Sequence, residues 1–103
     1  MQIFKGRCFL IRQVRLSKKA TAQLKKIQKQ IATKFAFWVL SIDEIGLISS
    51  RKQHPGCHDE PLLGQRQGQR SVRLNRQWRA IYVVLADKTI EFIEVQEITP
   101  HDY

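Results

Sequence analysis

The sequence predicts one α+β domain in which helices cover one face of an antiparallel sheet. Two patterns lead to this fold class. Apolar residues follow a helical period between residues 18 and 46, and three runs of strand-like composition follow residue 70. A chain of 103 residues has room for a single modest core, so we expect one domain spanning residues 1–103.

An N-terminal strand is expected around residues 8–16, where apolar and basic residues alternate imperfectly. Ser17 can then cap a helix, and Gly46 is a natural helix stop. Either one long helix or a helical hairpin with a break near residues 29–32 fits the period between them. The apolar residues that recur at steps of three and four, and so define one helical face, are Ala20, Leu24, Ile27, Ile31, Phe35, Trp38, Ile42 and Ile45.

The run from residue 35 to residue 40 is apolar on every side of such a helix. One interpretation is a helix segment buried on two faces. The other is a hydrophobic surface that a partner protein covers. The residues alone leave both open.

A three-strand meander is expected at the C-terminal end, after a long basic connection over residues 47–70. The first strand is short and surrounds Arg73. Residues 78–85 are nearly all apolar or β-branched, which predicts a central strand covered on both faces. After a tight turn at Asp87-Lys88, residues 90–98 alternate apolar residues with glutamates.

The charge is strongly and unevenly basic. Eighteen Lys and Arg face nine Asp and Glu, which gives a formal net charge of +9, and the first acidic residue is Asp43. After Arg79 the balance inverts and acidic residues predominate. A basic excess of this kind favours a polyanionic partner such as nucleic acid, because each neutralised phosphate releases counterions. The alternative is a well-solvated basic surface with no specific partner.

The chain reads as a cytoplasmic protein with no membrane span. No apolar stretch approaches the length that a bilayer requires, and the N-terminus lacks a signal-peptide pattern. The two cysteines, Cys8 and Cys57, are therefore expected to be reduced thiols.

Four arginines fall every third residue across the first turn of the meander: Arg70, Arg73, Arg76 and Arg79. If residues 75–77 form a three-residue loop, Arg73 and Arg79 lie directly opposite each other. Like charges in opposite positions destabilise a sheet, so this arrangement indicates an anion-binding site. If the loop has two residues, Arg73 faces Trp78 instead, and the arginines are ordinary surface residues.

The C-terminal His101-Asp102-Tyr103 carries groups that suit proton transfer. Histidine titrates nearest neutral pH, and tyrosine can donate a hydrogen bond or stack on a base. Arginines can stabilise the extra charge of a phosphorane, and RNA supplies its own 2′-hydroxyl nucleophile. These groups suffice for metal-independent RNA cleavage. The alternative is a frayed tail.

Residues 54–60 contain His54, Cys57 and His58 close together. No second ligand pair with zinc-like spacing accompanies them, so we expect neither a structural metal nor a cofactor. His58 is instead a candidate second proton carrier or phosphate contact.

The C-terminal half contains four segments in a characteristic order: Gly64-Gln65-Arg66-Gln67-Gly68-Gln69-Arg70-Ser71-Val72-Arg73-Leu74, Trp78-Arg79-Ala80-Ile81-Tyr82, Phe92-Ile93-Glu94-Val95 and His101-Asp102-Tyr103. This ordered set resembles the RelE/ParE toxin superfamily. Within it, the HigB-like and YafQ-like messenger RNA interferases of type II toxin–antitoxin systems are most similar. The N-terminal segment before Ser17 is longer than is usual there. The resemblance implies a RelE-like, microbial-ribonuclease-like fold, a ribosome-dependent endoribonuclease activity that inhibits translation, and neutralisation by a cognate antitoxin.

The resemblance also implies roles for individual residues. Arg73 and Arg79 match the basic positions that contact the scissile phosphate, and His101 and Tyr103 match positions that act in proton transfer or substrate orientation. The further residues expected to bind RNA are Arg66, Arg70, His58, Lys25 and Lys26.

Two other functions are compatible with the sequence. A ParE-like toxin shares the fold but poisons DNA gyrase; that branch generally lacks the arginine pair and a C-terminal proton-transfer residue. A non-catalytic RNA- or ribosome-binding module would use the basic charge alone, and its RNA binding would be sensitive to salt.

Overall fold

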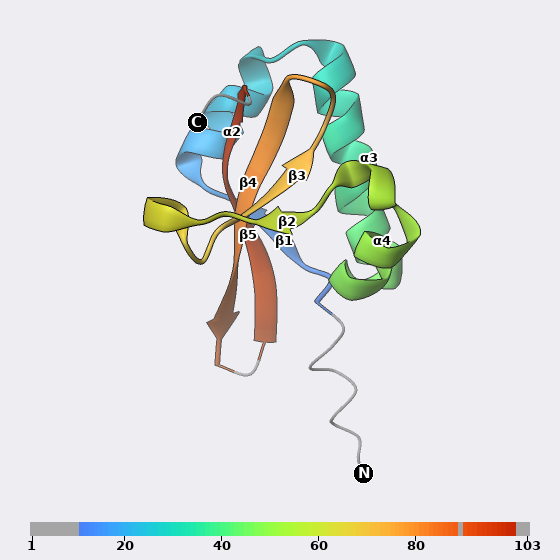
Figure 1. Ribbon diagram of the computed structural model, residues 1–103, viewed down its shortest axis with the longest axis vertical. Helices are drawn as coiled ribbons and strands as arrows, with labels where there is room; N and C mark the ends of the chain where they lie inside the picture. The colour runs from blue at the N-terminus through green and yellow to red at the C-terminus, as the bar shows by residue number, and fades with distance from the viewer. Residues whose placement is uncertain (1–10, 89, 101–103) are drawn as a thin grey trace.

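A computed structural model describes residues 11–88 and 90–100 of the chain. Its core is a five-stranded sheet with the strand order β1-β5-β4-β3-β2, covered by a layer of helices (Figure 1). The strands are Val14–Leu16 (β1), Glu60–Pro61 (β2), Arg70–Arg73 (β3), Trp78–Asp87 (β4) and Ile90–Pro100 (β5). The helices are Lys18–Lys26 (α2), Lys29–Ile45 (α3) and Leu47–Gln53 (α4), with 3-10 turns at Pro55–Cys57 (η1) and Gly64–Arg66 (η2).

The α+β class and the C-terminal meander are confirmed, but the sheet is mixed rather than wholly antiparallel. Strands β2 to β5 pair antiparallel, whereas β1 pairs parallel to β5, with Val14 opposite Ile93. No hairpin joins β1 to β5, because the helices and three strands lie between them along the chain. A parallel partner requires such a crossover connection.

The helical period from residue 18 to residue 45 belongs to a hairpin of two helices. Ser17 caps α2, since its Oγ accepts the N–H of Ala20 at 3.0 Å. The break falls at Ile27 and Gln28, slightly before the expected position, and both residues are extended. Gly46, at a φ of 84°, ends α3, and a third helix follows at once. The expected N-terminal strand is present over Val14–Leu16, and its residues before 11 lie outside the described part.

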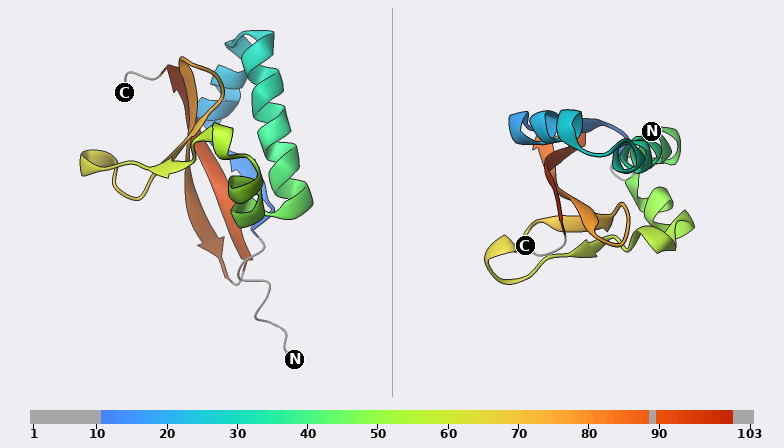
Figure 2. Two further views of the ribbon diagram at one scale, coloured as in Figure 1. Left: turned by 45° about the vertical axis from the view of Figure 1, so that its right-hand side comes forward. Right: turned by 90° about the horizontal axis from the view of Figure 1, so that it is seen from above.

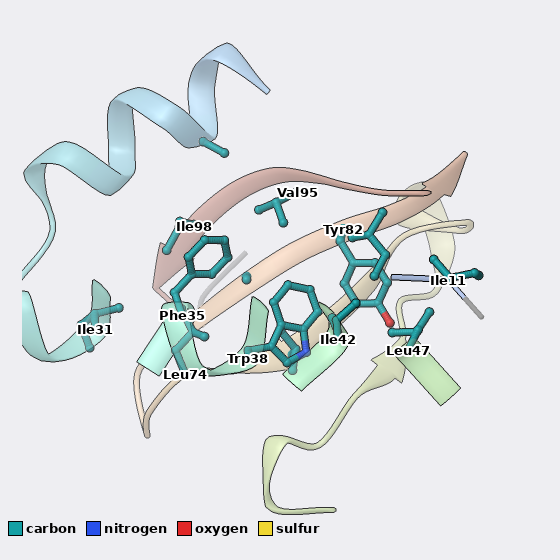
Figure 3. Packing of buried hydrophobic residues seen from close by; sticks show 14 residues of the cluster. Ile11, Ile31, Phe35, Trp38, Ile42, Leu47, Leu74, Tyr82, Val95 and Ile98 are labelled. Carbon is teal, nitrogen blue, oxygen red and sulfur yellow. The ribbon is translucent and has the colours of Figure 1, made fainter. Parts of the chain in front are cut away.

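One hydrophobic core lies between the helices and the sheet (Figures 2 and 3). Trp38 sits at its centre, with ring centroids 6.0 Å from Phe35 and 5.4 Å from Tyr82. The apolar run over residues 35–40 is buried on one face only, because Phe37 and Leu40 remain 63% and 50% exposed. No helix in the described part of the chain is long and apolar enough to cross a membrane.

Strand β4 was expected to be buried on both faces, and this is confirmed only for its first half. Residues 79–82 are buried, whereas Val84 and Leu85 are about two-fifths exposed (39% and 41%). The reason is visible in Figure 1, where the β4–β5 hairpin extends beyond the helices that cover its other end. A run of apolar residues does not by itself show where such a cover ends.

Candidate nucleic-acid interface

The turn between β3 and β4 places two arginines side by side. Arg73 pairs with Arg79 in the register of the two strands, and the backbone N–H of Leu74 donates to the carbonyl oxygen of Trp78 at 2.9 Å. The loop therefore has three residues, 75–77, as the anion-site interpretation requires. Asn75 shapes it, because its Oδ1 accepts the backbone N–H groups of Gln77 and Trp78, both at 2.8 Å.

Arg79 is built into this turn rather than displayed on the surface. It is only 7% exposed, and its Nη1 donates to the carbonyl oxygens of Asn75 at 3.0 Å and of Trp78 at 3.2 Å. These carbonyl dipoles offset the guanidinium charge, which allows a second arginine to lie opposite. Arg79 thus braces the loop and holds a fixed positive charge under it.

Arg73 is the more exposed member of the pair, although it is itself partly buried. Its Nε is shielded from solvent and has no hydrogen-bond partner in the described part of the chain. A buried donor without an acceptor is costly, so an oxygen from a bound ligand would stabilise it. Arg76, at the tip of the loop, is exposed and adds a third positive charge at this end of the sheet.

The predicted proton-transfer residues, His101 and Tyr103, lie outside the described residues. Strand β5 ends at Pro100, which pairs with Trp78, while Thr99 pairs with Arg79. The last described residues of the chain therefore lie beside the arginine pair.

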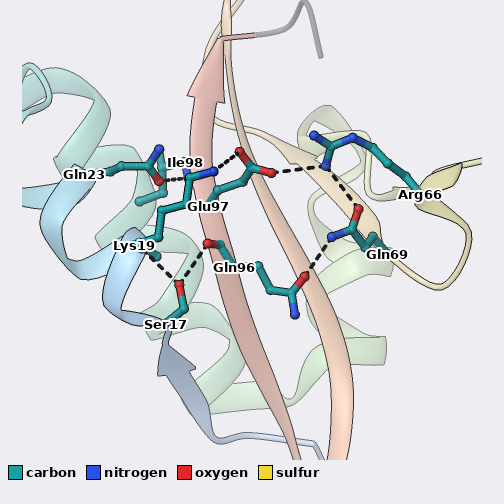
Figure 4. Close-up of polar contacts among 9 residues, drawn as sticks. Ser17, Lys19, Gln23, Arg66, Gln69, Gln96, Glu97 and Ile98 are labelled. Carbon is teal, nitrogen blue, oxygen red and sulfur yellow. Dashed lines mark hydrogen bonds and ion pairs between the residues drawn. The ribbon is translucent and has the colours of Figure 1, made fainter.

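Arg66 is tied to an acidic residue on the same face as Arg79. Its Nη1 donates to Glu97 Oε2 at 3.2 Å and to Gln69 Oε1 at 3.1 Å. Glu97 also pairs with Lys19 of α2 at 3.3 Å, so it joins elements on both sides of β5 (Figure 4). Glu97 is not among the site residues that the sequence predicts. Its position two residues before Thr99 on the same strand was the available signal, since alternate residues share a face.

Arg70 lies on the opposite face of β3 from Arg73, against the core. Its Nε donates to Asp59 Oδ1 at 2.7 Å, and the hydroxyl of Tyr82 donates to Asp59 Oδ2 at 2.5 Å. The Asp59 side chain is 4% exposed, and Arg51 Nε lies 3.5 Å from its Oδ2. Burial lowers the pKa of Arg70, but the hydrogen bond and charge of Asp59 outweigh it and raise that pKa above its ordinary value. Arg70 is therefore committed to a buried ion pair in this structure.

The other expected RNA-binding residues are solvent-exposed and share no element with the arginine pair. Lys25 and Lys26 lie in the last turn of α2. His58 follows η1 in a left-handed conformation, with a φ of 48°. Among residues 11–88 and 90–100, no group of three His, Cys, Asp or Glu side chains is placed to hold a metal ion.

Solved structures share this arrangement although sequence comparison finds no relative. No family model matches the chain, and no curated protein matches it. A chain of the E. coli DinJ–YafQ toxin–antitoxin complex superposes with a TM-score of 0.62 at 20% identity, over 88% of this chain and 94% of that one. The YoeB/ParE toxin from Agrobacterium tumefaciens gives 0.60 at 19% identity, over 86% and 98%.

A chain of the YoeB–YefM complex from Staphylococcus aureus gives a TM-score of 0.60 at 24% identity, over 85% of this chain and 94% of that one. Nearly the whole length of each of these chains is matched. This chain has the RelE/ParE toxin fold. The RelE-like fold expected from the sequence is thereby confirmed. At these identities the likeness establishes the fold, and the chemistry must come from the residues.

Proposed function

We propose that this RelE/ParE-fold chain is the toxin of a type II toxin–antitoxin system, an endoribonuclease that cleaves messenger RNA on the ribosome and so inhibits translation. The observation that carries the proposal is the pairing of Arg73 with Arg79 at the β3–β4 turn. Two arginines at opposite positions of neighbouring strands suit a phosphate whose negative charge grows during reaction.

The proposed reaction needs no metal or cofactor. A general base removes the proton of the messenger 2′-hydroxyl, whose oxygen then attacks the adjacent phosphorus. The bond from phosphorus to the 5′-oxygen breaks, and a general acid returns a proton to that oxygen. The products are a 2′,3′-cyclic phosphate and a free 5′-hydroxyl.

Each residue has a role in this scheme. Arg73 contacts the phosphate, and Arg79 supplies fixed positive charge beneath it. His101 exchanges a proton with the 2′-hydroxyl or with the leaving oxygen, and Tyr103 orients the base or phosphate. His101 directly follows Pro100, the strand end that pairs with Trp78.

The positive charge of the exposed surface favours an RNA partner. The exposed cations of the N-terminal half, Arg12, Lys18, Lys25 and Lys26, would dock on ribosomal RNA in the cytoplasm. A cognate antitoxin would neutralise the toxin, by analogy with the E. coli DinJ–YafQ toxin–antitoxin complex, whose chain shares this fold. Arg66 and His58 would contribute secondary RNA contacts, while Arg70 would support the site from below through Asp59.

A cleavage map tests the proposal. Purified protein is added to a translating extract, and primers are extended along a reporter message, with a parallel reaction that lacks ribosomes. We expect ribosome-dependent cuts at fixed codon positions that Arg73→Ala and His101→Ala remove. Lys88→Ala, an exposed cation at the far end of the sheet, serves as the matched control and should cut normally.

An intact message would reject the ribonuclease. If the same protein then inhibited DNA gyrase supercoiling, the chain would be a ParE-like toxin instead. If it bound RNA in a salt-dependent way and did neither, it would be a non-catalytic RNA-binding module.

A further inference from the structure

A cleft of ≈ 740 Å³ opens beside the arginine pair, between α3, α4, η1 and the β3–β4 turn. Arg73 belongs both to its wall and to the pair. The other side chains that matter here are Lys34, Phe37, Trp38, His54 and Arg76. No carboxylate lines the cleft among the described residues, so cations and aromatic rings define its character.

The aromatic part of the cleft has a fixed floor and an exposed rim. Trp38 forms the floor; it is 6% exposed and packs between Phe35 and Tyr82 (Figure 3). Phe37 forms the rim and is 63% exposed, so most of its ring is open to solvent. A shallower hollow on the surface of α3 also uses Phe37, together with Lys29 and Lys34.

The cations are placed around these rings. Lys34 is close enough to Cys57, on the η1 side, to lower the pKa of that thiol, although burial raises it more. Arg73 lines the cleft at the end of β3, and Arg76 lines it from the exposed loop tip. Positive charge therefore flanks the aromatic surface from both α3 and the β3–β4 turn.

We propose that this cleft is a subsite for one nucleotide of single-stranded RNA next to the scissile phosphate. The base stacks on Phe37 over the floor made by Trp38, and its phosphate lies between Arg73, Arg76 and Lys34. This inference rests on the proposed function, because Arg73 would bridge the scissile phosphate and the subsite.

Two features favour RNA over an acidic, apolar peptide. A basic groove with an exposed aromatic ring is how proteins hold single strands without sequence preference. The cleft volume also falls in the range of small-molecule sites and suits one nucleotide better than a docked helix. Such a peptide is the competing occupant that the experiment distinguishes.

Direct binding tests the subsite apart from cleavage. The probe is a fluorescein-labelled hexanucleotide with 2′-O-methyl groups throughout, which has no nucleophile and cannot be cut. Fluorescence anisotropy gives its Kd. Loss of a stacking partner in Phe37→Ala should weaken binding roughly fivefold or more, and Phe37→Trp should restore it.

Ile90→Ala is the matched control, because Ile90 is also exposed (58%) and lies at the other end of the β4–β5 hairpin. It should bind the probe like the wild type. In the same assay Lys34→Gln should reduce the slope of log Kd against log salt concentration by about 0.7, the value for one phosphate contact on a single strand. Lys52→Gln, an exposed lysine of α4 outside the lining of the cleft, should leave the slope unchanged.

A footprint locates the probe. Cys57 lines the cleft, so the bound hexanucleotide should slow its alkylation by N-ethylmaleimide, followed by mass spectrometry of the peptide that contains it. Unchanged alkylation at saturating probe would overturn the subsite, whatever the effect of Phe37→Ala.

The outcomes separate the two proposals. If the wild type cuts messages while Phe37→Ala binds the hexanucleotide normally, the ribonuclease stands and the subsite is wrong. If binding depends on Phe37 but no message is cut, the subsite stands and the ribonuclease is wrong. If Phe37→Ala keeps its RNA affinity but loses binding of a peptide of alternating Glu and Leu, the cleft is a protein-docking site and the inference is overturned.

Discussion

The hydroxyl of Tyr82, in the central strand, donates to the carboxylate of Asp59, in the connection between η1 and β2, over 2.5 Å. The same carboxylate accepts from Arg70 and lies beside Arg51. One nearly buried acid thus links α4, β3 and β4. Because β3 also carries Arg73, this network fixes the strand that presents the candidate interface.

We predict that Asp59→Ala destabilises the domain by about 3 kcal/mol, because it leaves Arg70 and the Tyr82 hydroxyl without their shared acceptor and Arg51 without its counter-charge. Urea unfolding followed by tryptophan fluorescence measures this. Asp87→Ala, at an exposed strand end, is the control and should change stability by less than about 0.5 kcal/mol. Equal stability of the two variants would show that the network contributes nothing net.

The Tyr82–Asp59 contact also predicts a loss of stability in alkali. Burial and then the charge of Asp59 raise the pKa of Tyr82 well above 10. In the unfolded chain the phenol ionises near pH 10, whereas the folded chain retains its proton. Stability should therefore be unaffected by this group below pH 10 and fall above it, by up to about 1.4 kcal/mol per pH unit.

Tyr82→Phe isolates that effect, because the variant has no phenol to ionise at this position. The difference between the urea stabilities of wild type and variant should be constant up to about pH 9.5 and shrink above it. A difference that stays constant to pH 11 would mean that Tyr82 ionises equally in the folded and unfolded chains.

The sequence was sufficient for the elements whose periodicity is strong. The steps of three and four from Ala20 to Ile45 predict helices, and Ser17 and Gly46 predict where they begin and end. It was not sufficient for the direction of β1, because a three-residue edge strand reads the same whether it pairs parallel or antiparallel. Nor could apolar composition show that the cover over β4 ends near Val83.

The candidate site was predictable to a similar degree. The spacing of Arg73 and Arg79 predicts their pairing once the loop length is chosen, and the structure has the three-residue loop. The partners of the individual arginines were not predictable, since Arg70 and Arg73 both stand among strand-forming residues in the sequence. The position of Asp59, eleven residues before Arg70, decides that Arg70 is held in an ion pair, whereas Arg73 pairs with Arg79 and lines the cleft.

The two paired arginines should respond differently to substitution. Arg73→Ala removes a partly buried group whose Nε is already unpaired among the described residues, so stability should change by less than about 1 kcal/mol. Message cleavage should fall by about 10²–10³, the usual cost of one donor to a developing oxyanion. Thermal unfolding and single-turnover cleavage measure the two effects.

Arg79→Ala should instead lower stability by about 2 kcal/mol, because the carbonyl oxygen of Asn75 loses its side-chain donor and that of Trp78 keeps only backbone donors. Its activity is then interpretable only at a temperature where the variant is fully folded. A variant as stable as the wild type would contradict the bracing role assigned to Arg79.

Asn75 allows the shape of the turn to be separated from its charge. Asn75→Asp keeps the side-chain oxygen that accepts the N–H groups of Gln77 and Trp78, so stability should stay within about 0.5 kcal/mol of wild type. The new carboxylate lies among Arg73, Arg76 and Arg79 and competes with phosphate, so cleavage and hexanucleotide binding should both weaken.

Asn75→Ala should have the opposite effects, a lower stability with better RNA binding than Asn75→Asp. It loses both accepted hydrogen bonds and should cost about 1–2 kcal/mol in stability, but it adds no charge and should bind the hexanucleotide better than Asn75→Asp does. Urea unfolding and anisotropy on the same samples give both quantities. A carboxylate in the turn would repel a bound phosphate. If Asn75→Asp nevertheless bound and cut RNA like the wild type, the positive potential of the turn would play no part in the interface.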